Sequence, residues 1–223
     1  MNRISLFLFC SLLPFAAIAA EEQAPLEITA DKALEWNQTN KTYIARGNAI
    51  AKQGDLSVKA DTLTATYAGA NGNTSDISLL EADGHVTLST ATDVATGDKA
   101  LYNLVEGKAT LSGSRPKIIQ NNKNTLEADQ IIVWTKNNIL DRAEAIGNVV
   151  IINGEQTATG DKATYNPNTT IAQLIGHVKV KQGANLLEGD QTDINLTTHV
   201  STMTSKSGTG RVKGVFYPGT EKK

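Results

Sequence analysis

Short runs in which apolar and polar side chains alternate recur along the chain. The clearest runs start two residues after a glycine, and their apolar positions are Ala49 and Ala51, Val86 and Leu88, Val149 and Ile151, and Val178 and Val180. A period of two places the apolar residues on one face of a β-strand. Each run therefore predicts a strand that buries one face.

Tight turns follow these strands. Gln53-Gly54, Asn153-Gly154 and Gln182-Gly183 come directly after three of the runs. An Asn-Gly pair between alternating runs is a strong hairpin signal, because both central residues of the turn adopt a positive φ. Two-residue hairpins join antiparallel strands, so this pattern argues against a parallel β-helix.

The return strands change phase at an aspartate. The apolar positions before Asp61 are even-numbered and those after it are odd-numbered, and the same change occurs at Asp129. A shift of one residue along a strand indicates a bulge or a sharp bend. Gly47, Gly147 and Gly176 are expected at the same bend on the neighbouring strand, where a residue without Cβ allows the backbone to kink.

The bend repeats along the chain, and the longest interval contains an extra loop at residues 69–76. The aspartates at the expected bends are Asp31, Asp61, Asp98, Asp129, Asp161 and Asp190. Bent antiparallel strands stacked in register form two packed sheets with an apolar interior. We therefore predict an all-β fold, an antiparallel β-jellyroll built from about six hairpin repeats of roughly 30 residues and open at both ends.

The terminal strands of such a stack have unpaired edges. They are expected at residues 26–36, at about residues 170–181 and at residues 210–217. An unpaired edge is a template for strand pairing with another copy or another protein. Small inward residues such as Ala49 and Ala60 fit a groove between the sheets, and they fit close packing of the sheets equally well.

The first residues have the features of a secretory signal peptide. Arg3 precedes a short apolar segment at residues 4–15, and small residues follow up to Ala19 and Ala20. The apolar segment is shorter than the roughly 20 residues of a membrane span. Cleavage near Ala19 or Ala20 is therefore favoured over an uncleaved membrane anchor.

The expected organisation is a signal peptide at 1–20, one β-jellyroll domain at 21–218 and a flexible tail at 219–223. The single cysteine, Cys10, lies in the predicted signal peptide, so the mature domain folds without disulfides. Removing Arg3 from the 21 Lys and Arg residues leaves 20 against 23 Asp and Glu. This balance, without a basic run, gives no indication of nucleic-acid binding.

No constellation of side chains indicates catalysis, a metal or a cofactor. The histidines are His85, His177 and His199, and the first two occupy the bend position that Asn48 and Asn148 fill elsewhere. One aspartate per repeat is too few for a calcium site, and such aspartates are expected to accept hydrogen bonds from local backbone amides. Acidic residues spread in this way do not converge as glycoside cleavage requires. We therefore expect a protein without enzyme activity.

Trp36 and Trp134 each lie five residues after a repeat aspartate. The alternation places both of them out of phase with the inward residues. They are expected to cover an outer sheet face or to mark the rim, and neither role needs a ligand.

Three segments carry a resemblance to a known family. YIARGNAIAKQGDLSVKADTLTATY at 43–67 combines an apolar strand, Gly-Asn, a Gly turn and Ala-Asp. With LEITADKALEW at 26–36 and GRVKGVFYP at 210–218, it resembles the OstA/LptA family of periplasmic lipopolysaccharide transport proteins. The departure from the family pattern is GSRPKII at 113–119, where Pro116 interrupts the expected strand.

The resemblance implies a function in the periplasm. Members of the family hold the acyl chains of lipopolysaccharide between their sheets. They join head-to-tail, with further copies or with the same fold on the inner-membrane transport complex and the outer-membrane translocon. The interior residues expected to contact lipid are Ile28, Ile44, Val58, Leu63, Val86, Leu88, Leu126, Ile131, Val133, Val149, Ile151, Val178 and Val180. Plain core packing stays open as the alternative role for each.

Other functions remain open on the sequence. A structural or adhesive secreted β-repeat protein would carry no lipid. The membrane-anchored jellyroll component of the same pathway would retain its N-terminus. A periplasmic polysaccharide-cleaving enzyme fits least well, because the acidic residues do not converge. Loss of turnover on mutation of Asp98 or Asp161 would be needed to support it.

Overall fold

The computed structural model describes residues 26–67, 77–136, 139–195, 197–198, 200–205 and 210–217. The predicted signal peptide, the loop at 69–76, His199 and the predicted tail at 219–223 lie outside the described residues. Within the described ranges all regular structure is β-strand. The same ranges contain no helix long and apolar enough to cross a membrane.

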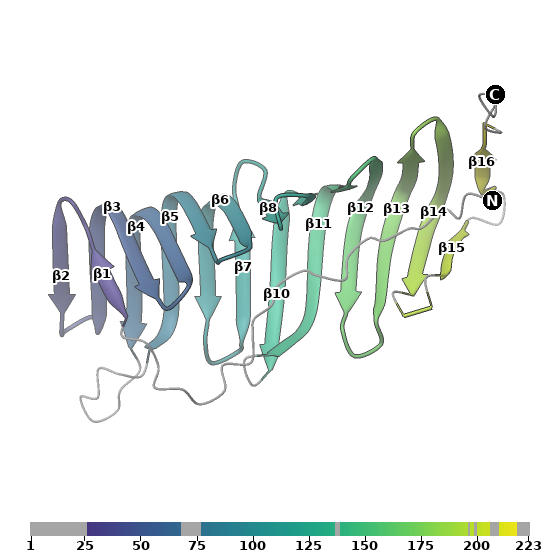
Figure 1. The fold of residues 1–223 in the computed structure, drawn as a ribbon. Helices are drawn as coiled ribbons and strands as arrows, with labels where there is room; N and C mark the ends of the chain where they lie inside the picture. The colour runs from purple at the N-terminus through teal and green to yellow at the C-terminus, as the bar shows by residue number, and fades with distance from the viewer. Residues whose placement is uncertain are drawn as a thin grey trace.

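Within these ranges, sixteen strands form one sheet. In chain order they are β1 (Glu27–Thr29), β2 (Ala33–Asn37), β3 (Thr42–Gln53), β4 (Leu56–Tyr67), β5 (Ile77–Ser89), β6 (Asp93–Asn103), β7 (Lys108–Ser112), β8 (Lys117–Gln120), β9 (Asn124–Glu127), β10 (Gln130–Lys136), β11 (Ile139–Asn153), β12 (Gln156–Asn166), β13 (Ile171–Gln182), β14 (Asn185–Asn195), β15 (Val200–Thr204) and β16 (Lys213–Val215). Each strand pairs antiparallel with its neighbours. The predicted all-β antiparallel fold class is confirmed, and the hairpins follow one another along the molecule (Figure 1).

The long strands bend near their middle, as the phase changes predict. In the β3–β4 pair the register passes from Arg46 opposite Thr62 to Ala49 opposite Ala60. Two residues of β3, Gly47 and Asn48, therefore lie opposite one residue of β4, which is a β-bulge. The β5–β6, β11–β12 and β13–β14 pairs have the same shift.

The bends divide the sheet into two layers. Layer 1 contains the strand halves that meet at the turns of Gly54, Gly154 and Gly183 and at the turn of residues 90–92, together with β1, β8, β9 and β16. Layer 2 contains the other halves, together with β2, β7, β10 and β15. Apolar residues of both layers, such as Ile151 and Tyr165, pack into one buried cluster. Two antiparallel layers around a shared apolar interior constitute the predicted β-jellyroll.

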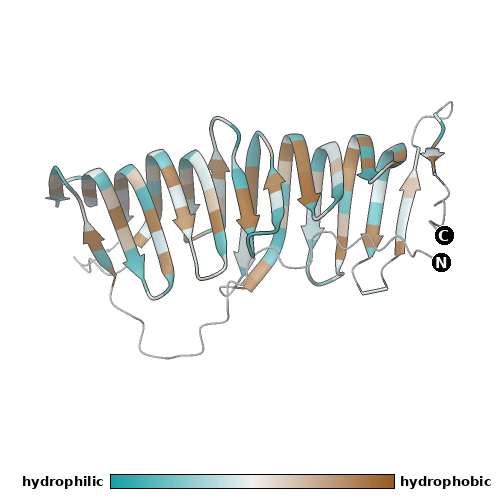
Figure 2. Ribbon diagram, turned by 45° about the horizontal axis from the view of Figure 1, so that its top comes forward, coloured by the Kyte–Doolittle hydropathy of each residue, from teal (hydrophilic) through white to brown (hydrophobic). Residues whose placement is uncertain are grey.

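We call the sides of the two layers that face each other the inner face. Hydrophobic and hydrophilic residues alternate along the strands (Figure 2), because successive side chains of a strand point to opposite faces. Most of the long apolar side chains therefore gather on the inner face.

The degenerate repeat around Pro116 forms two short strands instead of one bent strand. β7 pairs with β6 and β10 in layer 2, whereas β8 pairs with β6 and β9 in layer 1. Pro116 lies buried between them. The chain leaves regular pairing after Ser112 and resumes it at Lys117, and Pro116, which cannot donate to a strand ladder, lies in this break.

The prediction that the strand at about residues 170–181 has an unpaired edge is wrong. β13 occupies this region and pairs with both β12 and β14. Within the described residues, β1 and β2 pair only with β3, while β15 and β16 pair only with β14. Each end of the molecule therefore presents one unpaired strand edge per layer (Figure 1).

Candidate binding site on the inner face

The bulge determines which residues reach the inner face. On β3 the bulge holds two residues, Gly47 and Asn48, so odd-numbered positions face inward on both sides of it. On β4 a single residue, Asp61, lies at the bend, so the inward positions change from even to odd. The glycine-bearing strands thus keep their phase and the aspartate-bearing strands change it.

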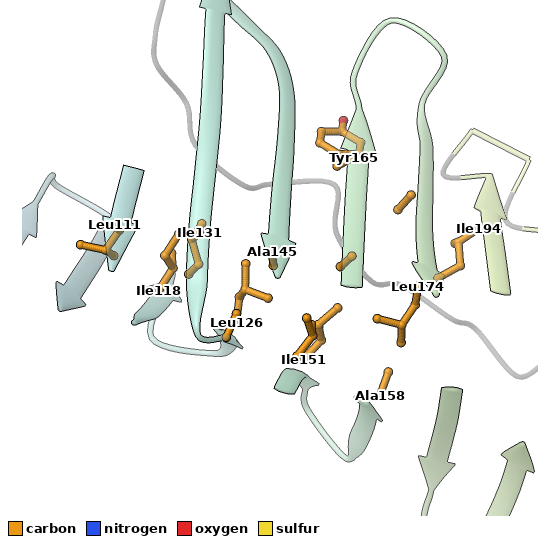
Figure 3. Close-up of a cluster of buried hydrophobic side chains, with 14 of the residues drawn as sticks. Leu111, Ile118, Leu126, Ile131, Ala145, Ile151, Ala158, Tyr165, Leu174 and Ile194 are labelled. Carbon is orange, nitrogen blue, oxygen red and sulfur yellow. The ribbon is translucent and has the colours of Figure 1, made fainter. Parts of the chain in front are cut away.

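Most of the predicted interior residues lie on the inner face. The registers place Ile28, Val58, Leu63, Val86, Leu88, Leu126, Ile131, Val133, Val149, Ile151, Val178 and Val180 there. Those next to the bend are the most buried, since Val86, Val149 and Val178 are each 1% exposed. The close-up shows Leu126, Ile131 and Ile151 among the cluster side chains that lie between the strands (Figure 3).

Ile44 is the exception. It pairs with Thr64, whereas its neighbour Ala45 pairs with Leu63 and is 3% exposed. Because β3 keeps its phase through the bulge, an even-numbered residue on this strand faces outward. The expectation that Ile44 lines the interior is therefore wrong.

Several inner-face residues were not among those predicted from sequence. They are Leu111, Ile118, Tyr165, Leu174 and Ile194, all in the buried cluster and labelled in Figure 3. Leu111 and Ile118 lie in the degenerate repeat, where the alternation of apolar and polar residues is not regular enough to identify inward positions. Tyr165 lies four residues after Asp161, the spacing at which the inward Ala65 follows Asp61, so extending the phase rule to every repeat would have identified it.

At each bend an aspartate holds the neighbouring strand. Asp61 lies 2.8 Å from Nδ1 of His85, and Asp161 lies 2.7 Å from Nδ1 of His177. Nδ2 of Asn148 donates to Asp129 at 2.9 Å. The sequence predicted that these aspartates accept hydrogen bonds from local backbone amides. Most of them instead contact the side chain of the residue that follows the bulge glycine.

Asp98 has a different partner from the other bend aspartates. It accepts a hydrogen bond from the backbone N–H of Ser114 at 2.6 Å. Bonds from Ser114 lower the pKa of Asp98 below its usual 3.8. The hydrogen bond to Asp61 and the charge of that residue raise the pKa of His85 above its usual 6.5.

The two tryptophans are not equivalent. Trp134 pairs with Arg142 across the outer face, and the guanidinium lies 4.2 Å from the centre of its ring. Trp36 instead pairs with Tyr43 in phase with the inner face, because Lys32 adds one residue between Asp31 and the pairing of β2. The expectation that Trp36 lies out of phase is wrong.

The inner face is exposed at the N-terminal end, where β2 has no further neighbour among the described residues. Leu34 and Trp36 are 64% and 54% exposed. Trp36 stacks on Tyr43 with 5.9 Å between ring centres, and its Nε1 donates to the Tyr67 hydroxyl at 3.2 Å. This aromatic group continues the apolar inner face up to the open end.

The described residues contain no group of three or more His, Cys, Asp or Glu side chains placed to hold a metal ion. The bend aspartates are bonded to groups of the neighbouring strand, as with Asp61 at 2.8 Å from His85. The main feature that the described residues present between the layers is the row of apolar side chains on the inner face.

Comparison with known families gives a match over most of the chain. The sequence model described as LptA/(LptD N-terminal domain) LPS transport protein matches residues 27–139 and 117–200. The two matched ranges together include the bends from Asp31 to Asp190.

Individual proteins match less fully. An uncharacterised protein of Rhizobium meliloti (strain 1021) is 28% identical over 113 residues, which are 49% of this chain and 60% of that protein. The crystal structure of LptH from Pseudomonas aeruginosa is described as the LptA homologous periplasmic component of the lipopolysaccharide transport device. It aligns with 87% of this chain and 96% of its own, at 14% identity and a TM-score of 0.27.

Proposed function

Because the chain belongs to the family of LptA and LptD N-terminal domain lipopolysaccharide transport proteins, we propose that it binds lipopolysaccharide in the periplasm and passes it from the inner to the outer membrane. The observation that carries this proposal is the apolar inner face between the two layers. Its buried residues come from strands along the molecule, from Ala60 on β4 to Ile194 on β14.

The proposed ligands of this face are the acyl chains. Each methylene removed from water contributes about 0.8 kcal/mol, so long chains are held firmly without any polar contact. The residues proposed to contact them are the inward ones near the middle of the molecule, including Leu126, Ile131 and Ile151. Catalysis is not needed for this task, and the energy for movement would come from a partner ATPase.

The unpaired ends support a bridge across the periplasm. β1 and β2 at one end and β15 and β16 at the other each leave one edge without a strand partner among the described residues. Strand addition at such edges would continue both layers into a neighbouring molecule. We propose head-to-tail contacts with further copies and with the same fold on the inner-membrane complex and the outer-membrane translocon.

The proposal includes the organisation expected from the sequence. Residues 1–20 are proposed to be a cleaved signal peptide, 21–218 the jellyroll domain and 219–223 a tail. The mass of the mature protein tests this point. A mass that still includes residues 1–20 would favour a membrane-anchored component of the same pathway.

Lipid bound to the protein from the cell provides the direct test. The full chain, isolated from the periplasm under mild conditions, is expected to carry lipopolysaccharide detectable by mass spectrometry after extraction. A folded periplasmic protein that carries none, and that also binds none when purified lipopolysaccharide is added, would contradict the proposal and favour a structural or adhesive role.

A further inference from the structure

A row of polar side chains crosses layer 1 where its strands reach their turns. Directly opposed pairs are Asp93–Gln120, Gln120–Asn124, Asn124–Asn153, Asn153–Gln156, Gln156–Gln182 and Gln182–Asn185. One residue comes from each of β6, β8, β9, β11, β12, β13 and β14. We call this row the polar ladder.

The polar ladder lies on the inner face. Two positions further along the same strands is an apolar row made of Ala95, Ile118, Leu126, Ile151, Ala158, Val180 and Leu187, which belong to the buried cluster or pack against it. Residues two apart on a strand share a face. The polar ladder is therefore an inward-facing polar border beside the apolar row.

Parts of the polar ladder are buried without hydrogen-bond partners. Asp93 is 5% exposed and Gln156 is 4% exposed. Among the described residues, both carboxyl oxygens of Asp93, Nε2 of Gln156 and Oε1 of Gln182 have no partner. A buried donor or acceptor without a partner destabilises a fold, so these atoms need an explanation.

Stability alone does not explain the polar ladder. In β4, Leu56 occupies the corresponding place, two residues before the inward Val58. The fold thus accepts an apolar side chain at this level of the sheet. The chain instead places polar groups at this level on strand after strand from β6 to β14.

We propose that the polar ladder binds the hydroxyl and amide groups at the junction between the acyl chains and the sugar of lipopolysaccharide. This inference rests on the proposed function, since the acyl chains would lie along the adjacent apolar row. The oxygens of Asp93 and Gln182 accept hydrogen bonds from hydroxyl and amide donors, and Nε2 of Gln156 donates to a carbonyl. Phosphate offers only acceptors to a carboxylate, so the ladder fits the uncharged junction rather than a phosphate.

The polar ladder would then set how deep the lipid lies. Chains enter as far as the apolar row allows, and the junction stops at the level where its polar groups find partners. A lipid without hydroxyl and amide groups at this level would leave the buried oxygens of Asp93 unpaired. The site would therefore distinguish lipopolysaccharide from other lipids with similar chains.

The experiment compares two probes on the full mature chain. Purified lipopolysaccharide carries the hydroxyl and amide groups, and tetradecanoate supplies an acyl chain without them. The variants are Gln156→Leu and Asp93→Leu. Should Asp93→Leu fail to fold, Gln156→Met takes its place as the second variant, because methionine matches glutamine more closely in shape than leucine does. Thr157→Val is the matched control, because Thr157 is the next residue of β12 and faces outward.

Loss of one hydrogen bond at the polar ladder is expected to weaken lipopolysaccharide binding about tenfold, which corresponds to about 1.4 kcal/mol. Binding of tetradecanoate, and lipopolysaccharide binding by Thr157→Val, should not change. The unfolding temperature of Gln156→Leu should equal or exceed that of the wild type.

Two results would overturn the inference in different ways. If the wild type and Gln156→Leu bind lipopolysaccharide equally, the polar ladder is not its site, while the proposed function stands. If the wild type binds neither probe, the proposed function itself fails, and the inference fails with it.

Discussion

At the scale of the residue, the bend is a contact between an aspartate on one strand and a glycine with its successor on the next. Asn148 follows Gly147 with a φ of 45° and donates to Asp129 at 2.9 Å. The left-handed conformation suits Gly and, among other residues, Asn and His most readily. This explains why the position after the glycine alternates between these two residue types.

Replacement of a bend glycine tests this contact. Gly147 has a φ of 78°, and a Cβ at this position would overlap with the Asp129 carboxylate. Gly147→Ala is expected to destabilise the protein by about 1–3 kcal/mol, through backbone strain and the lost bond. Gly154→Ala is the control, because its φ is 59° and no atom lies within 4 Å of the added Cβ. Equal urea midpoints for the two variants would show that the Asp129 contact contributes nothing.

The Asp61–His85 pair predicts a pH dependence. The pKa of His85 is raised in the folded state, so its contribution to stability is fully present below its usual pKa of 6.5 and is lost as the pH rises through the folded value. An NMR titration of His85 should give a pKa above 6.5 in the wild type. In Asp61→Asn it should fall back towards the usual value. An unchanged titration in Asp61→Asn would contradict the assignment of Asp61 as the cause.

At the scale of the element, the repeat determines most of what can be predicted from sequence. Alternation, the turns at Gly54, Gly154 and Gly183, and the phase change at Asp61 predict bent antiparallel strands, because each depends on local backbone geometry. Pairing register is different, since it depends on contacts between strands. Ile44 and Trp36 show this limit.

Each of these two residues was assigned to the wrong face of its strand, because the alternation was counted one residue out of phase. For Ile44, the sequence does not show that the two-residue bulge at Gly47 preserves the phase of β3. For Trp36, one extra residue after Asp31 moves the pairing of β2, so that Leu34 takes the place opposite Ala45. The polar ladder was missed for a related reason, because its members become a row only when the strands are aligned.

The terminal strands predict specific contacts between copies. Outward positions on β2 are Ala33, Glu35 and Asn37, and those on β15 are Val200, Thr202 and Thr204. Each double variant carries one cysteine at an outward position of β2 and one at an outward position of β15. On oxidation, the variants whose two cysteines lie opposite each other in the register of the contact between copies should form disulfide-linked multimers. Opposed residues on paired strands bring their Cβ atoms to about 4.5–5.5 Å.

The control for these edge pairs moves one cysteine to an internal strand. Lys59 on β4 faces outward but lies between β3 and β5. Lys59→Cys combined with Thr202→Cys is therefore expected to remain monomeric on oxidation. Multimers in this control, or none in any edge pair, would argue against assembly through the edges.

At the scale of the whole molecule, the two layers form an extended stack rather than a compact core with a single site. Adjacent strands contribute inward apolar residues to one buried cluster that extends from Ala60 to Ile194, and hydrophobic residues recur on strand after strand along the stack (Figure 2). A protein built in this way is suited to pass an amphiphile along itself. The central claim is therefore that lipopolysaccharide occupies the space between the layers.

Photo-crosslinking in the cell tests this claim most directly. Ile151 and Ile152 are neighbours of one residue type on β11, with Ile151 facing inward opposite Leu126 and Ile152 facing outward opposite Thr125. A photoreactive residue at position 151 is expected to give lipopolysaccharide adducts, and one at position 152 to give none. Adducts at neither position in a folded periplasmic protein, or equal adducts at both, would contradict the account.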